Sequence, residues 1–239
     1  MRAQLTLPTR PRLALVLALR RIAGNAILGM LLAGTMYAVA LDTTQLRQQL
    51  ATRFGTERVA LLNDWLKTTG DASALGEAEK LKRINDFVNQ KIAFEDDRSV
   101  WDQSDYWATP LETIGQGRGD CEDFAIIKYV SLRRAGIASD KLRLIYVKAR
   151  INTPDGPIQV AHMVLAYYAS PNAEPILLDN LQPKILPASK RPDLKPVFSF
   201  NSAGIFAGVS GRDKASAGGI GRLSRWEDVL RRIVAEGYE

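Results

Sequence analysis

The stretch GRGDCEDFAIIKYVSLRRAG, residues 117 to 136, determines how the rest of the sequence is interpreted. Its second part has the apolar spacing of a helix that starts at or next to Cys121, carries two arginines in its last turn and closes at Gly136. Glycines at alternate positions, 115, 117 and 119, precede this helix and predict a flexible loop. The sequence therefore predicts a cysteine at a helix N-terminus, directly after a glycine loop.

Cys121 is the only cysteine in 239 residues, and three carboxylates surround it, those of Asp120, Glu122 and Asp123. It cannot form an intramolecular disulfide, so it is either a buried, inert side chain or a reactive thiol. A thiol reacts as the thiolate, and neighbouring negative charge opposes its ionisation. From residue types alone, the positive end of the helix dipole explains the three acids more simply than a bound metal ion does.

The pattern on either side of this helix predicts a single α+β domain. Before it, residues 43–54, 57–69 and 74–92 are expected to be helical, and residues 93–120 to be irregular. After it, strands are expected at 142–151, 157–168 and 176–181, joined by turns at 153–156 and 170–175. Residues 182–221 are turn-rich, with GRDKASAGGIG (211–221) as a mobile loop, and a helix is expected over 223–239.

His162, the only histidine, lies in the second of these strands, with its side chain on the same face as those of Val160 and Val164. If the next turn is centred near residue 171, Asp179 lies within about two residues of the position facing His162, in the range of a diagonal neighbour. A thiol at a helix N-terminus, an imidazole and a carboxylate are the three groups of a Cys-His-Asp catalytic triad. A core cysteine and a satisfied strand histidine remain the alternative.

Five arginines and no acid occupy the first forty residues, whereas the remainder is nearly balanced, with 27 basic and 26 acidic residues. The overall charge of +6 therefore does not indicate a nucleic-acid-binding protein. The basic start, the apolar run 22–37 and the small residues 38–40 predict a signal peptide over 1–40, cleaved after Ala40. An uncleaved inner-membrane anchor is the alternative. Either reading places the mature domain, 41–239, outside the cytoplasm.

The segments DYWATPLETIGQGRGDCEDFAIIKYVSL, LRLIYVKA, AHMVLAYY and ILLDNL resemble the bacterial transglutaminase-like cysteine proteinases. The resemblance implies a papain/transglutaminase-like fold, with a helical N-terminal part and the helix of Cys121 packed on an antiparallel sheet that carries His162 and Asp179. It implies that Cys121 is the nucleophile, His162 the base and then the acid, and Asp179 the orienting carboxylate. It also implies a Ca²⁺ site, formed by Asp120, Glu122 and Asp123.

The same resemblance implies a calcium-dependent periplasmic endopeptidase. Its expected substrate is the N-terminal region of a large surface adhesin, cut at a di-alanine-like site, which releases the adhesin and promotes biofilm dispersal. Its expected partner is an inner-membrane receptor for cyclic diguanylate that sequesters the protease with a periplasmic domain; the protease itself binds no nucleotide. Two alternatives remain: a transglutaminase-type acyltransferase with the same site, and a non-catalytic, calcium-gated binding module.

Two further expectations concern the surroundings of the site. The aromatic residues Trp101, Tyr106 and Trp107 either wall the cleft or pack beneath it. The backbone N–H of Cys121 is the expected oxyanion donor, because a helix N-terminus presents unpaired amides.

Overall fold

The computed structural model describes residues 43–211, 213–214 and 224–238. The predicted signal peptide, 1–40, and most of the predicted mobile loop, 211–221, therefore lie outside the described residues. By its internal contacts the chain divides into two units, residues 1–45 and 46–239, and the second contains all the strands and helices named below. Among the described residues, none of the helices has the length and apolar character needed to span a bilayer.

Residues 46–54 are helical, and three longer helices follow them in the chain. These are α2 (Val59–Ser73), α3 (Glu77–Lys91) and α6 (Cys121–Arg134). Two short helices, α4 (Asp97–Trp101) and α5 (Pro110–Gln116), lie between α3 and α6, and α7 (Ser224–Ala235) follows the sheet. The helices expected at both ends of the domain and around Cys121 are confirmed.

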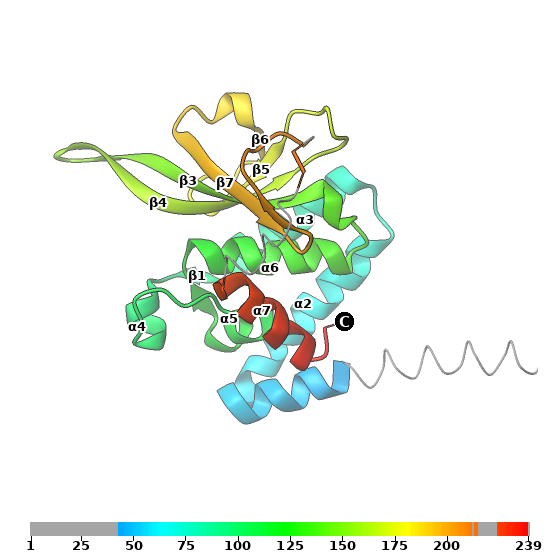
Figure 1. The fold of residues 1–239 in the computed structure, drawn as a ribbon. Coiled ribbons are helices and arrows are strands. Elements are labelled where there is room, and N and C mark those ends of the chain that lie inside the picture. The colour runs from blue at the N-terminus through cyan, green and yellow to red at the C-terminus, as the bar shows by residue number, and fades with distance from the viewer. Residues whose placement is uncertain (1–42, 212, 215–223, 239) are drawn as a thin grey trace, which may run out of the picture. The chain divides into compact units, whose positions relative to one another are not determined.

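The main sheet has six strands in the order β6-β5-β4-β3-β7-β8, each antiparallel to its neighbours. The strands are β3 (Leu142–Thr153), β4 (Gly156–Tyr167), β5 (Ile176–Leu178), β6 (Leu186–Pro187), β7 (Leu194–Asn201) and β8 (Gly204–Phe206). β3 and β4 form one long hairpin that extends beyond the other strands (Figure 1). A second, two-stranded parallel sheet joins β1 (Ala93–Phe94) to β2 (Arg118–Gly119).

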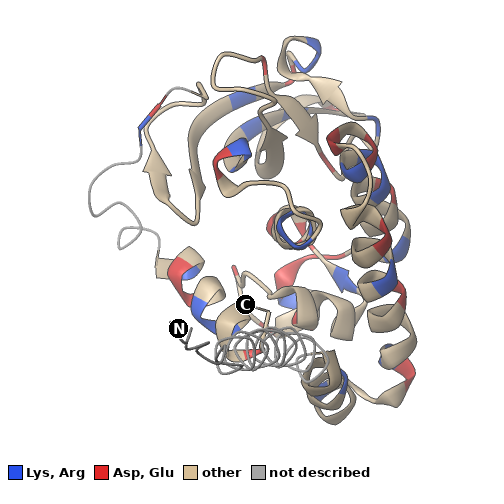
Figure 2. Cartoon of the chain, turned by 90° about the vertical axis from the view of Figure 1, so that its right-hand side faces the viewer, with Lys and Arg blue, Asp and Glu red and all other residues tan. Residues whose placement is uncertain are grey.

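Helix α6 is the centre of the core. It lies between the sheet and the other helices, and in the turned view of Figure 2 it is seen nearly end on. Every residue from Asp123 to Leu132 is buried, because the sheet covers one side of the helix and α2, α3 and α5 cover the other. A helix surrounded in this way must be apolar almost all round, which explains the sequence FAIIKYVSL. This packing fixes the position of its first residue, Cys121.

Two regions differ from the sequence-based expectation. Residues 93–120, expected to be irregular, contain α5, whose Thr109 accepts the Glu112 N–H at 3.2 Å while the Glu112 carboxylate accepts the Thr109 N–H at 2.9 Å. This capping box, with Pro110 at the first helical position, could have been recognised in the sequence TPLE. The turn-rich region 182–221 contains β7, which pairs with the central strand β3.

Candidate active site

The first turn of α6 is held in place by its own third residue. Asp123 is fully buried, and its two carboxylate oxygens accept the backbone N–H groups of Ala108, at 2.7 Å, and Asp120, at 3.3 Å. The side chain therefore ties the segment before α5 to the start of α6. Cys121 lies between Asp120 and Asp123 in the sequence, so the hydrogen bonds of these two residues fix its position.

The glycines before Cys121 do not form a flexible loop, which corrects the expectation from the sequence. Gly115 is buried inside α5, where an added Cβ would lie 2.3 Å from the ring of Phe54. Gly117 has a φ of 68° and ends α5 in the left-handed conformation. An added Cβ at Gly119 would lie 2.4 Å from the Asp123 carboxylate. Each glycine is therefore required by close packing or by backbone conformation.

His162 and Asp179 are in direct contact. His162 Nε2 lies 2.8 Å from Asp179 Oδ1, and the side chains are 3% and 0% exposed. The strand register explains the contact: Leu165 pairs with Leu178, so Asp179 follows the end of β5 and lies diagonal to His162 on β4. The Leu181 backbone N–H donates to the same carboxylate oxygen at 3.0 Å, which fixes the orientation of the carboxylate.

A third residue, Arg191, completes the contacts of this carboxylate. Its Nη2 lies 2.8 Å from Asp179 Oδ2 and 2.7 Å from Asp193 Oδ2. Burial by itself would raise the pKa of Asp179, but the hydrogen bonds and charges of His162 and Arg191 bring it below its ordinary value. Asp179 is thus a carboxylate, and His162 Nδ1 is the ring nitrogen left for proton transfer.

Cys121 lies against the strand that carries His162. Its sulfur interacts with the backbone amide of Met163, the residue directly after His162, and α6 packs along β4. The thiol donates to Glu122 Oε2 at 2.8 Å. Burial, then the charge and hydrogen bond of Glu122 and the charge of Asp120, raise the pKa of the thiol far above its usual range. With these neighbours alone, the sulfur is a protonated thiol.

The carboxylates around Cys121 extend further than the sequence indicated. Three groups of oxygen and sulfur ligands, each within 4.8 Å, combine Asp120 with Cys121 and Glu122, Asp97 with Asp120 and Asp123, and Asp97 with Asp105 and Glu122. Asp97, from α4, occurs in two of the three groups and is only 4% exposed. Sequence reasoning missed it because it lies more than twenty residues upstream, in the stretch expected to be irregular.

These carboxylates fit a hard divalent cation. One oxygen each of Asp97 and Asp120 is buried and has no hydrogen-bond partner among the residues that the structure describes. Burial and the neighbouring acids raise the pKa of Asp97 to about 6 and that of Asp120 to about 9, so negative charge is poorly compensated here. Calcium takes six to eight oxygen ligands and would supply the missing positive charge. Asp97, Asp120, Glu122 and Asp123 all occur in these groups, and both oxygens of Asp123 also accept backbone N–H groups.

Lys128, two turns along α6 from Cys121, is a further residue that the sequence did not single out. It is 1% exposed, its Nζ has no hydrogen-bond partner in the described structure, and the charge of Asp179 acts on it. Burial lowers the pKa of this ammonium to about 7, although Asp179 acts in the opposite direction. The lysine therefore adds a positive charge that acts on Asp179 when the ammonium is protonated.

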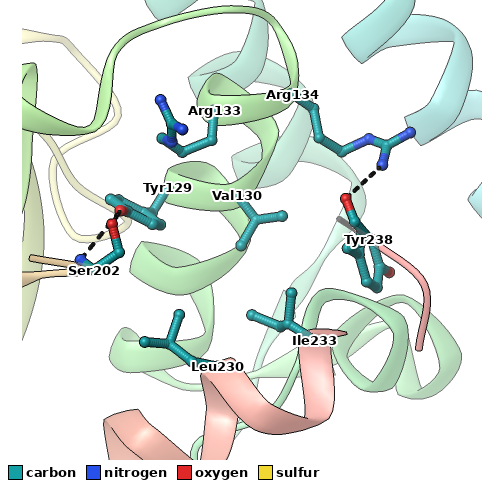
Figure 3. A pocket seen from close by; sticks show the side chains of 8 residues that line it. All are labelled: Tyr129, Val130, Arg133, Arg134, Ser202, Leu230, Ile233 and Tyr238. Atoms are coloured by element: carbon teal, nitrogen blue, oxygen red, sulfur yellow. Dashed lines mark hydrogen bonds between the residues drawn. The ribbon is translucent and has the colours of Figure 1, made fainter. Parts of the chain in front are cut away.

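The aromatic residues before Cys121 pack against other aromatic rings. Trp107 is buried and stacks on Phe200 with 5.6 Å between ring centroids, and Trp101 packs against Tyr106 at 4.7 Å. A separate cavity of about 210 Å³ lies between α6 and α7, with Arg133 and Arg134 at its rim (Figure 3). It contains none of the residues described above, so it is not the catalytic cleft.

Comparisons with known proteins identify the family and similar structures. A model of the bacterial transglutaminase-like cysteine proteinases matches residues 67–193, just over half of the chain and including Cys121, His162 and Asp179. The solved structure of Legionella pneumophila LapG is similar, with 34% identity, a TM-score of 0.65 and coverage of 80% of this chain and 97% of that one.

Two further structures of the same Legionella protein bear on the metal. Its calcium-bound form is similar with 36% identity, a TM-score of 0.65 and coverage of 80% of this chain and 98% of that one, and an EGTA-treated form with 34% identity is equally similar in fold. No match was found among curated proteins.

Proposed function

Because the chain belongs to the bacterial transglutaminase-like cysteine proteinases, we propose that it is a calcium-dependent periplasmic endopeptidase in which Cys121, His162 and Asp179 form the catalytic triad. The observation that supports this best is the 2.8 Å contact between His162 and Asp179, because the strand that carries His162 also contacts the Cys121 sulfur. A thiol, an imidazole and a carboxylate in this order are the components of nucleophilic peptide hydrolysis.

In the first half of the reaction, Cys121 Sγ attacks the carbonyl carbon of the scissile peptide bond, and its proton passes to His162 Nδ1. Asp179, bonded to Nε2, keeps the imidazole in the required tautomer and stabilises the imidazolium. The oxyanion faces the backbone N–H of Cys121 at the N-terminus of α6. His162 then protonates the leaving amine, the C–N bond breaks, and a thioester remains on Cys121.

In the second half, His162 removes a proton from water, and the resulting hydroxide attacks the thioester carbonyl. The C–S bond breaks, the carboxylic acid product leaves and the thiol recovers its proton from His162. The sum is the addition of one water across one peptide bond. A transglutaminase would use the same residues but pass the acyl group to an amine, so the mass of the products distinguishes the two activities.

Asp97, Asp120 and Glu122 would hold the calcium ion, with Asp123 as the residue that shapes the site. A divalent charge beside Cys121 would supply the positive potential that the acids at the start of α6 lack. In the described structure Glu122 accepts a hydrogen bond from the Cys121 thiol. A cation bound to the Glu122 carboxylate would therefore also free the thiol to interact with His162. We assign the ion a structural and electrostatic role and no contact with the substrate.

The substrate that this family membership favours is the N-terminal region of a large surface adhesin, cut at a di-alanine-like site. The leader over 1–40 would place the enzyme in the periplasm, where release of the adhesin would promote biofilm dispersal. An inner-membrane receptor that binds cyclic diguanylate would control the protease by sequestering it. A non-catalytic, calcium-gated module is the remaining alternative, and it predicts that Cys121→Ala keeps full biological activity.

The test uses protein purified after expression of the full-length chain, and the N-terminal fragment of the largest adhesin encoded in the same genome. Wild type, Cys121→Ala and wild type with a calcium chelator are compared by intact mass spectrometry. Two fragments that sum to substrate plus water, formed only by wild type with free calcium, are expected. Cleavage that survives Cys121→Ala would refute the mechanism, and joined products would identify an acyltransferase.

A further inference from the structure

The strand that carries His162 has an open outer edge. β5 pairs with β4 only at Leu165, Ala166 and Tyr167, so the stretch from Pro157 to Val164 has β3 on one side and no strand on the other. Within the described part of the chain, no hydrogen bond is made to the outward main-chain groups of residues 157–162. Open edges normally carry devices that prevent pairing with other chains, such as prolines and charged side chains; over residues 157–162 the one such residue is Pro157, so the edge beyond it requires an explanation.

The direction of the peptide groups along this edge follows from the strand register. The Arg150 N–H donates to the Asp193 carbonyl at 2.9 Å and therefore points away from β4. Arg150 faces Gln159 across the β3–β4 ladder. Since peptide groups alternate in an antiparallel pair, Gln159 and then Ala161 point their N–H and C=O groups outward. Pro157, which has no N–H to offer, occupies the next outward position, where an edge strand tolerates proline.

This open edge leads directly to the nucleophile. Met163 is the next residue in the outward series, and its amide interacts with the Cys121 sulfur. Gln159 and Ala161 are exposed, whereas Met163 is only 2% exposed beneath the site. Two residues with free, outward main-chain groups therefore stand in line with the sulfur, along the single strand that also carries His162.

We propose that the substrate binds as an added β-strand along the outer edge of β4, hydrogen-bonded to the main chain of Gln159 and Ala161, with its scissile bond beyond them at Cys121. This rests on the proposed protease function. Strand addition takes its affinity from main-chain groups and leaves side-chain selection to pockets at alternate positions. The substrate class is thus an extended segment of about five residues or more, without proline opposite Gln159 or Ala161.

Gln159→Pro tests the proposal because it removes an outward N–H and no bond of the β3–β4 ladder. Gln159→Ala, which keeps the N–H, is the matched control. Cleavage of the adhesin fragment should fall about tenfold or more in kcat/KM for Gln159→Pro and stay within about twofold of wild type for Gln159→Ala. The rate at which iodoacetamide alkylates Cys121 should be the same in all three proteins, because this small reagent needs no added strand.

A second measurement does not depend on how proline is accommodated. In ¹⁵N-labelled Cys121→Ala protein, amide exchange at Gln159 and Ala161 should be fast, and at Val160 slow. The unlabelled adhesin fragment should then slow exchange at Gln159 and Ala161 and leave Val160 unchanged. The proposal would be overturned if exchange at Gln159 and Ala161 did not change when the fragment is bound, or if Gln159→Pro cleaved the fragment with the kcat/KM of wild type. The protease assignment would stand in both cases.

Two other outcomes have separate meanings. Protection of Gln159 and Ala161 without the fragment, lost on dilution, would show that a second copy of the chain occupies the edge, and would refute the substrate role. If wild type alkylates normally but cuts no part of the fragment, the proposed function fails and the strand-addition proposal fails with it.

Discussion

The guanidinium of Arg191 lies 2.8 Å from Asp179 Oδ2, on the carboxylate oxygen that His162 does not use. Arg191 also contacts Asp193, whose carbonyl accepts the Arg150 N–H from β3. The carboxylate next to the imidazole is therefore connected to the central strand of the sheet through a buried arginine. Asp179 sits just past a three-residue strand, and without Arg191 the contacts of this carboxylate would all be on its other oxygen, from His162 and the Leu181 amide.

Replacing Arg191 should consequently affect both stability and turnover. Arg191→Met removes the guanidinium that pairs with the buried Asp179 carboxylate, and removal of one member of a buried pair typically costs about 3–5 kcal/mol of unfolding free energy. A misplaced imidazole should lower kcat by as much as about 100-fold with little change in KM. Urea denaturation and steady-state cleavage measure the two effects. Arg191→Lys keeps the charge but loses the planar guanidinium, so its stability and activity should lie between those of wild type and Arg191→Met. Full activity in both variants would contradict this role.

Lys128 predicts a pH-dependent stability. Burial lowers the pKa of its ammonium to about 7 in the folded chain, whereas the ordinary value of a lysine is 10.5. Below pH 7 the lysine is charged in both states, and the full cost of burying the charge is present. Between pH 7 and 10.5 the unfolded chain binds more protons than the folded one, so the cost declines as the pH rises and disappears above 10.5.

Lys128→Met should therefore stabilise the protein most below pH 7, by roughly 1–4 kcal/mol, and by progressively less as the pH approaches 10.5. Urea denaturation at pH 6, 8 and 10, in excess calcium, measures this trend. Lys148→Met, at an exposed position of β3, is the control and should show no such trend. A gain in stability that is the same at all three pH values would mean that the pKa of Lys128 does not differ between the folded and the unfolded chain, and would contradict the prediction.

The acidic cluster predicts that Asp97 is a calcium ligand, although it lies far from Cys121 in the sequence. Asp97→Asn keeps the shape and removes the charge, so calcium affinity, measured by isothermal titration calorimetry, should fall by roughly tenfold or more, with a parallel rise in the calcium needed for cleavage. Asp102→Asn is the matched control, because Asp102 is exposed on the same short segment and belongs to none of the three ligand groups. Equal affinities in the two variants would remove Asp97 from the site.

The parts of this fold that the sequence could predict are those with local signals. The apolar spacing and closing glycine of α6, the TPDG turn of the β3–β4 hairpin and the length of the next turn were sufficient to place Cys121 at a helix start and Asp179 diagonal to His162. Each of these depends on residues that are neighbours along the chain, for which periodicity and turn chemistry are reliable guides.

The parts that were missed depend on contacts between distant segments. Asp97 and Arg191 reach the site from a short helix and from a loop before β7, and nothing in their own neighbourhoods marks them as functional. β7 has charged and proline residues in its first half, so it lacks a clear strand pattern, and the ladder with β3 forms it. Only α5 was a local signal overlooked, since TPLE contains both the capping box and the N-terminal proline.

The glycines before Cys121 show the same distinction between local and tertiary causes. Alanine is therefore expected to have opposite effects on stability at Gly115, in α5, and at Gly70, in α2. At Gly115 an added methyl group would lie 2.3 Å from the Phe54 ring, so Gly115→Ala should destabilise the protein by about 1–3 kcal/mol through overpacking. At Gly70, inside α2, an added methyl group meets nothing within 4 Å, and Gly70→Ala should stabilise the protein by about 0.5–1 kcal/mol. Urea denaturation with calcium present distinguishes the two. If the segment were the flexible loop that alternate glycines suggest, both substitutions would be neutral or stabilising, so a loss confined to Gly115→Ala would show that tight packing behind the cysteine is what these glycines permit.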